Sequence, residues 1–189
     1  MVIENDFFIS PKFKISDWKN INLNKDSSKE DWIKAIEIFE DRIYGRFLNP
    51  IESIENNSDV SVKKFCGFSI MALDCLLIET MNQFYNGWDV TQIKNWKSFR
   101  DFFKISPFFS SSFNSTISRI FYSHIRCGIL HQAQTKKQTI IRIDTQHMVE
   151  KIDSMDVDKG LILNRLLFHE ALKSEINSFV KKIINPVSE

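Results

Sequence analysis

The chain has 189 residues, a length typical of one domain, and 43% of them are hydrophobic, including 17 phenylalanines. Its 25 basic and 24 acidic residues give a formal net charge of +1, which excludes a protein that holds nucleic acid by bulk charge alone. Only five glycines and four prolines are present, so the composition favours long helices over a β fold with many turns.

The predicted elements begin with an irregular arm over residues 1–27, whose apolar residues follow no sustained period and leave room for at most a short strand. Ser27 and Glu30 have the spacing of a capping box, so a helix is predicted to begin there. Apolar residues then recur at steps of three and four over 32–47, which indicates one buried helical face. Pro50 is predicted to stop or kink this helix.

The second predicted helix spans about 60–86 and is apolar almost all round, as is typical of a central, buried helix. Gly87 follows as a natural C-terminal stop. A shorter helix is predicted over 96–105. The next one is predicted to be capped within 110–112 and to carry the stretch 121–132, FYSHIRCGILHQ.

The residue composition changes after this stretch. Residues 139–143, TIIRI, are β-branched and predict a strand or a small β-hairpin. A long final helix is predicted over about 159–184. We therefore expect a single all-α domain over 1–189, a helical bundle of about five helices with a small β-hairpin or strand after the helix that carries 121–132.

The cysteines and the N-terminus bear on location. Cys66, Cys75 and Cys127 lack CxxC spacing, and free thiols in a reducing cytosol explain them most simply. The first residues do not combine a basic region with an apolar one, so we expect no signal peptide. The longest apolar stretch, 66–78, is interrupted by polar residues and is too short to span a bilayer. We expect a cytoplasmic protein without a membrane segment.

Arg126 and His131 are separated by four residues on the predicted helix. Five positions correspond to about 140° of rotation, so the two side chains meet only by reaching around into a cleft, or by facing a second copy across a two-fold axis. Arginine suits phosphate oxygens, and histidine suits proton transfer near neutral pH. Together they suit metal-independent cleavage of RNA by its own 2′-hydroxyl.

This motif stands among further blocks, RI..RFL.PI over 42–51, GF…ALDCLLIE over 67–79 and IRCGILHQ over 125–132. Together they resemble bacterial proteins of the HEPN superfamily, with a similarity that covers roughly 32–143. The resemblance implies a homodimeric helical bundle that cleaves RNA without a cofactor, with Arg126 and His131 as catalytic residues. It also implies a role in toxin–antitoxin systems or antiphage defence, with an antitoxin protein as a further partner.

Two alternatives stay open. Cys127 follows the motif arginine where HEPN nucleases often have a polar residue, which fits a non-catalytic module that binds RNA or protein. The other alternative is a structural helical dimer whose Arg126 is neutralised by a buried acid. Asp74 and Glu79 lie inside the second predicted helix, where a carboxylate needs a partner. Each either forms a structural pair with another arginine or orients Arg126 or His131.

Other residues on and after the motif helix have weaker signals. Lys136, Lys137 and Arg142 are candidates for binding RNA phosphates, or belong to a solvated basic loop. His124, Cys127 and His131 share one helical face and are of types that bind zinc, but no fourth ligand stands nearby, so no metal site is predicted.

Three positions remain, and each has a plain structural interpretation. Gly128 costs about 1 kcal/mol in mid-helix, which predicts a close approach of another helix or a ligand. His147 and His169 have no partner pattern, and we interpret both as surface or structural residues.

Overall fold

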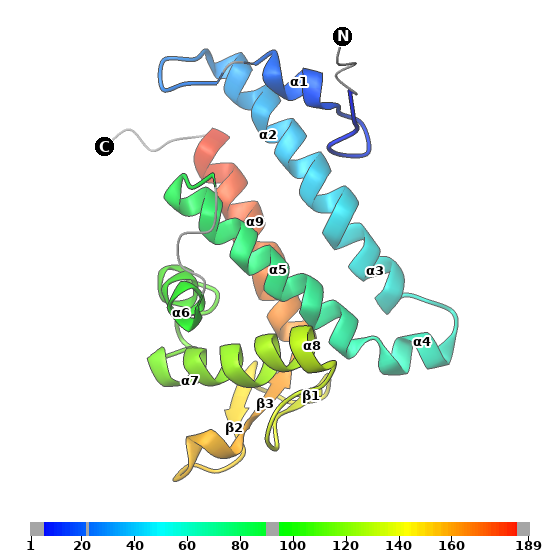
Figure 1. The fold of residues 1–189 in the computed structure, drawn as a ribbon, viewed down its shortest axis with the longest axis vertical. Coiled ribbons are helices and arrows are strands. Elements are labelled where there is room, and N and C mark those ends of the chain that lie inside the picture. Colours follow the sequence, from blue (N-terminus) through cyan, green and yellow to red (C-terminus); the bar gives the residue numbers. More distant parts are fainter. Residues whose placement is uncertain (1–5, 22, 90–94, 185–189) are drawn as a thin grey trace. The chain divides into compact units, whose positions relative to one another are not determined.

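The computed structural model describes residues 6–21, 23–89 and 95–184. These residues are mostly helical and include a small three-stranded sheet (Figure 1). The chain forms two compact units, one of residues 1–56 and 177–189 and the other of 57–176. Organisation as a single domain therefore stays a prediction. None of the described helices is both long and apolar enough to cross a membrane.

The first unit contains α1 (Ile15–Lys19), α2 (Lys29–Ile43), the π-helical segment η1 (Tyr44–Leu48), α3 (Asn49–Glu55) and the last residues of α9 (Arg165–Ile184). Its helices pack through aromatic and polar contacts, with the rings of Phe39 and Phe179 5.6 Å apart.

The start of α2 differs by one residue from the predicted capping box. Ser28 caps the helix, since its hydroxyl accepts a hydrogen bond from the Asp31 amide at 3.1 Å. Pro50, predicted to stop or kink this helix, does not stop it. The helical path continues into α3, and the π-helical segment η1 lies directly before Pro50.

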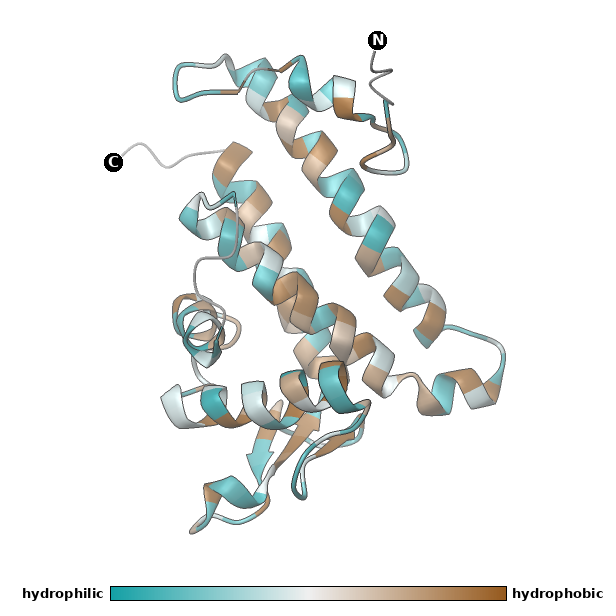
Figure 2. Cartoon of the chain, in the orientation of Figure 1, coloured by the Kyte–Doolittle hydropathy of each residue, from teal (hydrophilic) through white to brown (hydrophobic). Residues whose placement is uncertain are grey.

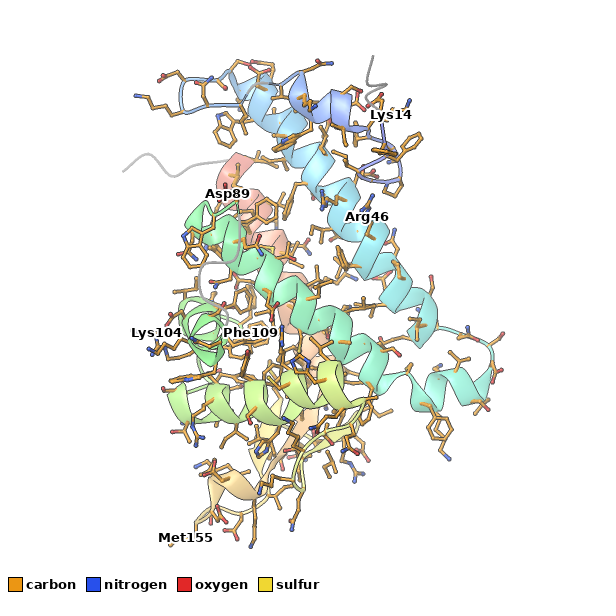
Figure 3. All side chains as sticks on the ribbon, in the orientation of Figure 1. Lys14, Arg46, Asp89, Lys104, Phe109 and Met155 are labelled. Carbon is orange, nitrogen blue, oxygen red and sulfur yellow. The ribbon has the colours of Figure 1, made fainter. Side chains whose placement is uncertain are left out.

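The N-terminal arm contains the short helix α1, which the sequence did not predict, and an isolated bridge between Phe8 and Lys14. The arm crosses directly over Gly45, where a Cβ atom would lie 2.2 Å from Pro11 Cγ. The guanidinium of Arg46 donates to the carbonyl of Phe8 at 2.8 Å (Figure 3). The arm is therefore tied to the helix next to it rather than loose.

The second unit begins with α4 (Val60–Phe65) and α5 (Gly67–Asn86), which the sequence predicted as one helix. The helices separate at Cys66, and α5 ends at Gly87 as predicted, in a left-handed conformation with φ of 62°. Helix α6 (Trp96–Ile105) has the predicted bounds. Figure 2 shows apolar residues along much of α5, but only one side of the helix is buried, since Phe68, Leu76 and Phe84 are 39%, 43% and 45% exposed.

Phenylalanines form the core of this unit. The rings of Phe103 and Phe113 are stacked at 4.1 Å, and those of Phe121 and Phe168 at 5.1 Å. Phe109, labelled in Figure 3, is fully buried among them. Aromatic pairs at such distances add about 0.5–1.5 kcal/mol each beyond their buried area. They hold α6 and the helix that carries Phe121 against α9.

The strand predicted within 139–143 is present, but it belongs to a mixed sheet and not to a β-hairpin. Strands β1 (Ile140–Arg142), β2 (Val149–Lys151) and β3 (Leu161–Asn164) lie in the order β1-β3-β2, with β1 parallel and β2 antiparallel to β3. A 3-10 turn, η3 (Val157–Lys159), precedes β3, and Met155 lies exposed in the loop before it (Figure 3).

Strand β3 consists of residues 161–164, which were predicted as the start of the final helix. Gly160, with φ of 149°, allows the close approach of Thr139, and the following residues then pair with β1. Helix α9 begins only at Arg165, because the Asn164 side chain accepts from the amides of Leu166 and Leu167. The fold is therefore helix-rich but not a five-helix bundle with a hairpin.

Candidate functional site

The motif lies on a continuous helical path of α7 (Ser115–Ile120), the π-helical segment η2 (Phe121–Arg126) and α8 (Cys127–Gln132). Asn114 caps it rather than a serine of 110–112, since the Asn114 side chain accepts from the Ile117 amide at 2.9 Å. The Cys127 amide bonds to the carbonyl of Tyr122, five residues earlier. Such π turns are rare and occur frequently at functional sites.

Arg126 ends the π segment, and its guanidinium has four neighbours, of which Cys127 forms a side-chain hydrogen bond with it. Its Nε donates to Glu79 Oε1 on α5 at 2.8 Å, and both side chains are partly exposed, by 19% and 23%. The guanidinium carbon lies 5.5 Å from the ring centroid of Tyr122. Burial works against the charge of Arg126, but the hydrogen bond and the charge of Glu79 outweigh it and raise the pKa of Arg126.

The fourth neighbour of Arg126 is His131. Nη1 of Arg126 lies 3.4 Å from Nε2 of His131, at the long end of hydrogen-bonding distance. The His131 side chain is exposed. The structure thus brings together the two motif residues within one chain, despite their different positions around the helix. Their meeting point is open to solvent, where a ligand can reach both.

The end of α8 holds His131 in place through a backbone crossing. Ala133 adopts the left-handed conformation, with φ of 54°, and the Gln134 amide bonds back to the Gly128 carbonyl at 3.4 Å. A Cβ atom on Gly128 would lie only 2.5 Å from the Gln134 carbonyl oxygen. The close approach predicted at Gly128 is therefore made by the chain's own loop, not by another helix or a ligand.

Asp74 and Glu79 have different partners. Asp74 is fully buried and bonds to Nδ1 of His169 on α9 at 2.8 Å, while Glu79 holds Arg126. Five positions along α5 turn the two carboxylates about 140° apart, so they point to different surroundings. His169 is 3% exposed, so it is a structural residue and not a surface one. Of the two acids proposed to orient Arg126, Glu79 has the contact and Asp74 is part of the core.

His124 and Thr139 tie the motif helix to the sheet. His124 Nδ1 lies 3.1 Å from Thr139 Oγ1, which also accepts from the Leu161 amide at 3.1 Å. Burial lowers the pKa of His124. The charge of Asp158 raises this pKa, and nearby basic residues lower it further. His124 therefore does not join His131 and Cys127, and within 6–21, 23–89 and 95–184 no group of three His, Cys, Asp or Glu is placed to hold a metal ion.

The three basic residues after the motif, Lys136, Lys137 and Arg142, differ in their contacts and exposure. The Lys136 amide donates to the His124 carbonyl at 2.9 Å, and its side chain is half-buried. Lys137 is exposed and has φ of 56°. Arg142 forms two hydrogen bonds with Asp144, at 2.7 and 2.6 Å, and that carboxylate raises the pKa of Arg142. The charge of Arg142 is thus balanced locally, whereas the two lysines lie close to the end of α8.

Two features of this unit had no signal in the sequence. The π turn before Arg126 leaves no residue pattern that differs from an ordinary helix. Glu175 on α9 is buried and accepts hydrogen bonds from Tyr85 and Ser106, two side chains far from it along the chain. Burial and the neighbouring Glu175 raise the pKa of Tyr85, which therefore stays a hydrogen-bond donor. This cluster joins α5, α6 and α9 and has a structural role.

Comparisons with models of protein families, with curated proteins and with solved structures found no match to this chain. The resemblance to HEPN proteins therefore depends on the motif blocks alone.

Proposed function

We propose that this chain is a metal-independent endoribonuclease of HEPN type, in which Arg126 and His131 act on RNA. The observation that supports this most is their meeting point, with Nη1 and Nε2 3.4 Å apart beside solvent. Glu79 supports it further, because its hydrogen bond to Nε fixes the guanidinium beside His131, where it can meet phosphate oxygens.

In the proposed reaction the 2′-oxygen of a ribose attacks the neighbouring phosphorus. A new bond forms between the 2′-oxygen and phosphorus, and the bond from phosphorus to the 5′-oxygen of the next nucleotide breaks. One base takes the proton of the 2′-hydroxyl, and one acid gives a proton to the departing 5′-oxygen. The products are a 2′,3′-cyclic phosphate and a 5′-hydroxyl. Arg126 stabilises the charge that develops on the phosphate oxygens.

A homodimer completes this proposal. One chain supplies one His131, which serves as either acid or base, and a two-fold axis would bring His131 of the partner subunit to the same phosphate. Lys136 and Lys137 are the proposed phosphate contacts beside the site, whereas Arg142 is already held by Asp144. By resemblance, the nuclease would act in the cytoplasm as a toxin or an antiphage effector, with an antitoxin as its protein partner.

The test is cleavage of a mixed-sequence RNA by purified protein in excess EDTA. We expect wild-type protein to release 2′,3′-cyclic phosphate ends, and Arg126→Ala and His131→Ala to lower the rate by about 10²–10⁴-fold. His147→Ala and Arg100→Ala are matched controls, since within the described residues neither side chain bonds to Arg126 or His131, and they should cleave as wild type does. Equal cleavage by all five proteins would refute the assignment.

The second candidate is a non-catalytic RNA-binding module. The observation that favours it is the pairing of Arg126 with Glu79, which already satisfies part of the guanidinium, together with Cys127 in the position after it. This candidate predicts that wild-type protein retains RNA on a filter without cleaving it, and that Arg126→Ala reduces retention while His131→Ala does not.

A further inference from the structure

Helix α4 and the first turn of α5 present an aromatic and basic surface that the proposed reaction does not use. Phe65 is 75% exposed and Phe68 is 39% exposed. Lys63 and Lys64 are exposed beside them, and Lys64 Nζ lies 5.6 Å from the ring centroid of Phe65. We call these four residues the Phe65 surface. An exposed apolar group of this kind marks an interaction site more often than an isolated surface residue does.

Charge separates the possible ligands of this surface. Within the described ranges 6–21, 23–89 and 95–184, neither Lys63 nor Lys64 forms an ion pair. Two positive charges next to an open aromatic ring match a single nucleic-acid strand, in which phosphates alternate with bases that stack on aromatic side chains. An apolar partner protein would gain nothing from the two lysines.

From Phe68 onward, the Phe65 surface lies on the side of α5 that also carries Glu79. Phe68, Ala72 and Leu76 precede Glu79 by eleven, seven and three residues, the spacing of one helical face. All three are at least partly exposed, and Leu76 is 43% exposed. From Gly67 to Glu79 the helix rises about 18 Å, a distance that a strand of a few nucleotides spans.

We propose that single-stranded RNA held at Arg126 and His131 runs along this face and stacks a base on Phe65, with Lys63 and Lys64 at the adjacent phosphates. This inference rests on the proposed function and names its substrate class as unpaired RNA that reaches beyond the cleaved bond. Stacking on an aromatic side chain tolerates every base, so the surface adds affinity without adding sequence preference.

The test measures binding separately from cleavage. Fluorescence anisotropy with a 2′-O-methyl oligonucleotide of about 12 nucleotides, which lacks the attacking hydroxyl, reports affinity alone. We expect Phe65→Ala to weaken binding by about 5- to 100-fold. Phe65→Tyr should bind as wild type does, while Phe65→Leu, which keeps an apolar side chain but no ring, should resemble Phe65→Ala. Val60→Ala is the matched control, because Val60 is 76% exposed on the same helix.

The lysines give a second measurement. Lys63→Ala with Lys64→Ala should reduce the slope of log affinity against log salt by about 1–2, as expected when two phosphate contacts are lost. A substrate of about 3 nucleotides, too short to span from Arg126 to Phe65, should be cleaved equally by wild type and by Phe65→Ala.

The outcomes distinguish this inference from the proposed function. Unchanged affinity in every variant of the Phe65 surface, with binding lost in Arg126→Ala, would overturn the inference and leave the nuclease standing. Absence of RNA binding by the wild type would overturn both. If Phe65→Leu keeps affinity, or if Phe65→Ala changes only the sedimentation coefficient, the surface binds protein or a second copy and the inference is wrong.

Discussion

Asp74 and Glu79 are carboxylates on the same helix, yet Asp74 forms a buried pair and Glu79 forms a partly exposed one. Asp74 bonds to His169 with both side chains at or below 3% exposed, in the interior of the second unit. Glu79 bonds to Arg126 at the same distance of 2.8 Å, but 23% and 19% of these side chains are exposed. The bond length is the same for both pairs, so what separates the pair of the proposed site from the buried one is access to solvent.

This difference follows from the cost of burying charge. A buried pair must satisfy itself, because removing either partner leaves an uncompensated polar group in a medium of low dielectric. A pair at the edge of solvent can exchange one partner for a ligand, because water or a phosphate compensates the group that is released. Arg126 is in the second situation, and in the proposed reaction the exposed His131 beside it would be the proton-transfer group.

The largest predicted effect is on stability and tests the buried pair. Asp74→Ala should lower the free energy of unfolding by about 3–5 kcal/mol, because it leaves His169 buried without its carboxylate. Urea denaturation monitored by circular dichroism measures this loss. RNA cleavage per folded molecule should stay within about 3-fold of wild type, since Asp74 does not contact Arg126.

A control for this variant is His169→Ala together with the double substitution. If the two residues act on each other, the double variant should cost much less than the sum of the single ones. A loss below about 1 kcal/mol in Asp74→Ala would mean that the pair contributes little, and the contrast with Glu79 would fail.

The second prediction tests the exposed pair. Glu79→Ala should lower the cleavage rate by about 10- to 100-fold, because the guanidinium loses the contact that orients it and small displacements of a catalytic group are costly. Its effect on unfolding should stay below about 1 kcal/mol, since the site is partly hydrated. Glu79→Gln keeps an oxygen acceptor for Nε and should restore part of the rate.

Single-turnover cleavage at saturating RNA measures the effect of Glu79 without a contribution from binding. Faster cleavage in Glu79→Ala would show that Glu79 restrains Arg126 by competing with phosphate, and would reverse its proposed role.

The sequence predicted those parts of this architecture that depend on local signals. The bounds of α6 and the end of α5 at Gly87 are confirmed, because a side-chain cap at Asn95 and a glycine with positive φ are local signals. The start of α9 was not predictable in the same way. Residues 161–164, LILN, continue the apolar pattern of the helix, and they become a strand only because β1 pairs with them, as Ile140 does with Ile162.

The residue types of the candidate site could likewise be predicted from local patterns, but their contacts could not. Arg126 and His131 were found from their spacing and residue types, and Glu79 was one of two acids proposed to orient them. The sequence analysis left Asp74 and Glu79 as equal candidates, because His169, the partner of Asp74, is 95 positions away and was interpreted only as a surface or structural residue. The π turn that precedes Arg126 was missed, since it changes hydrogen bonds without changing the residue pattern.

The third prediction adds a histidine that belongs to neither pair. Burial lowers the pKa of His124 from its ordinary value of 6.5, so the unfolded chain binds a proton at this residue more readily than the folded one. Its contribution to stability is therefore complete above pH 6.5 and is lost as the pH falls below that value. The loss is at most about 1.4 kcal/mol per pH unit.

Urea denaturation between pH 7.5 and 5 tests this prediction when wild type is compared with His124→Gln, which cannot take up a proton. The variant should be less stable at neutral pH, yet its stability should fall less steeply in acid. Parallel curves for the two proteins would assign the acid sensitivity to another group, with the Asp74–His169 pair as the next one to test.

The smallest predicted effect separates the scaffold of the site from its chemistry. Ala133 holds a left-handed conformation, with φ of 54° and ψ of 28°, directly after the turn that carries His131. An alanine in this conformation costs about 1–2 kcal/mol, and glycine removes that cost but makes the unfolded chain more flexible. Ala133→Gly should therefore raise the free energy of unfolding by about 0.5–1 kcal/mol.

Because the same backbone bonds from Ala133 and Gln134 to α8 remain available, His131 keeps its position and the cleavage rate of Ala133→Gly should not change. A stabilised variant with reduced cleavage would mean that strain at Ala133 contributes to the placement of His131, and that the exposed pair depends on the scaffold as closely as the buried one does.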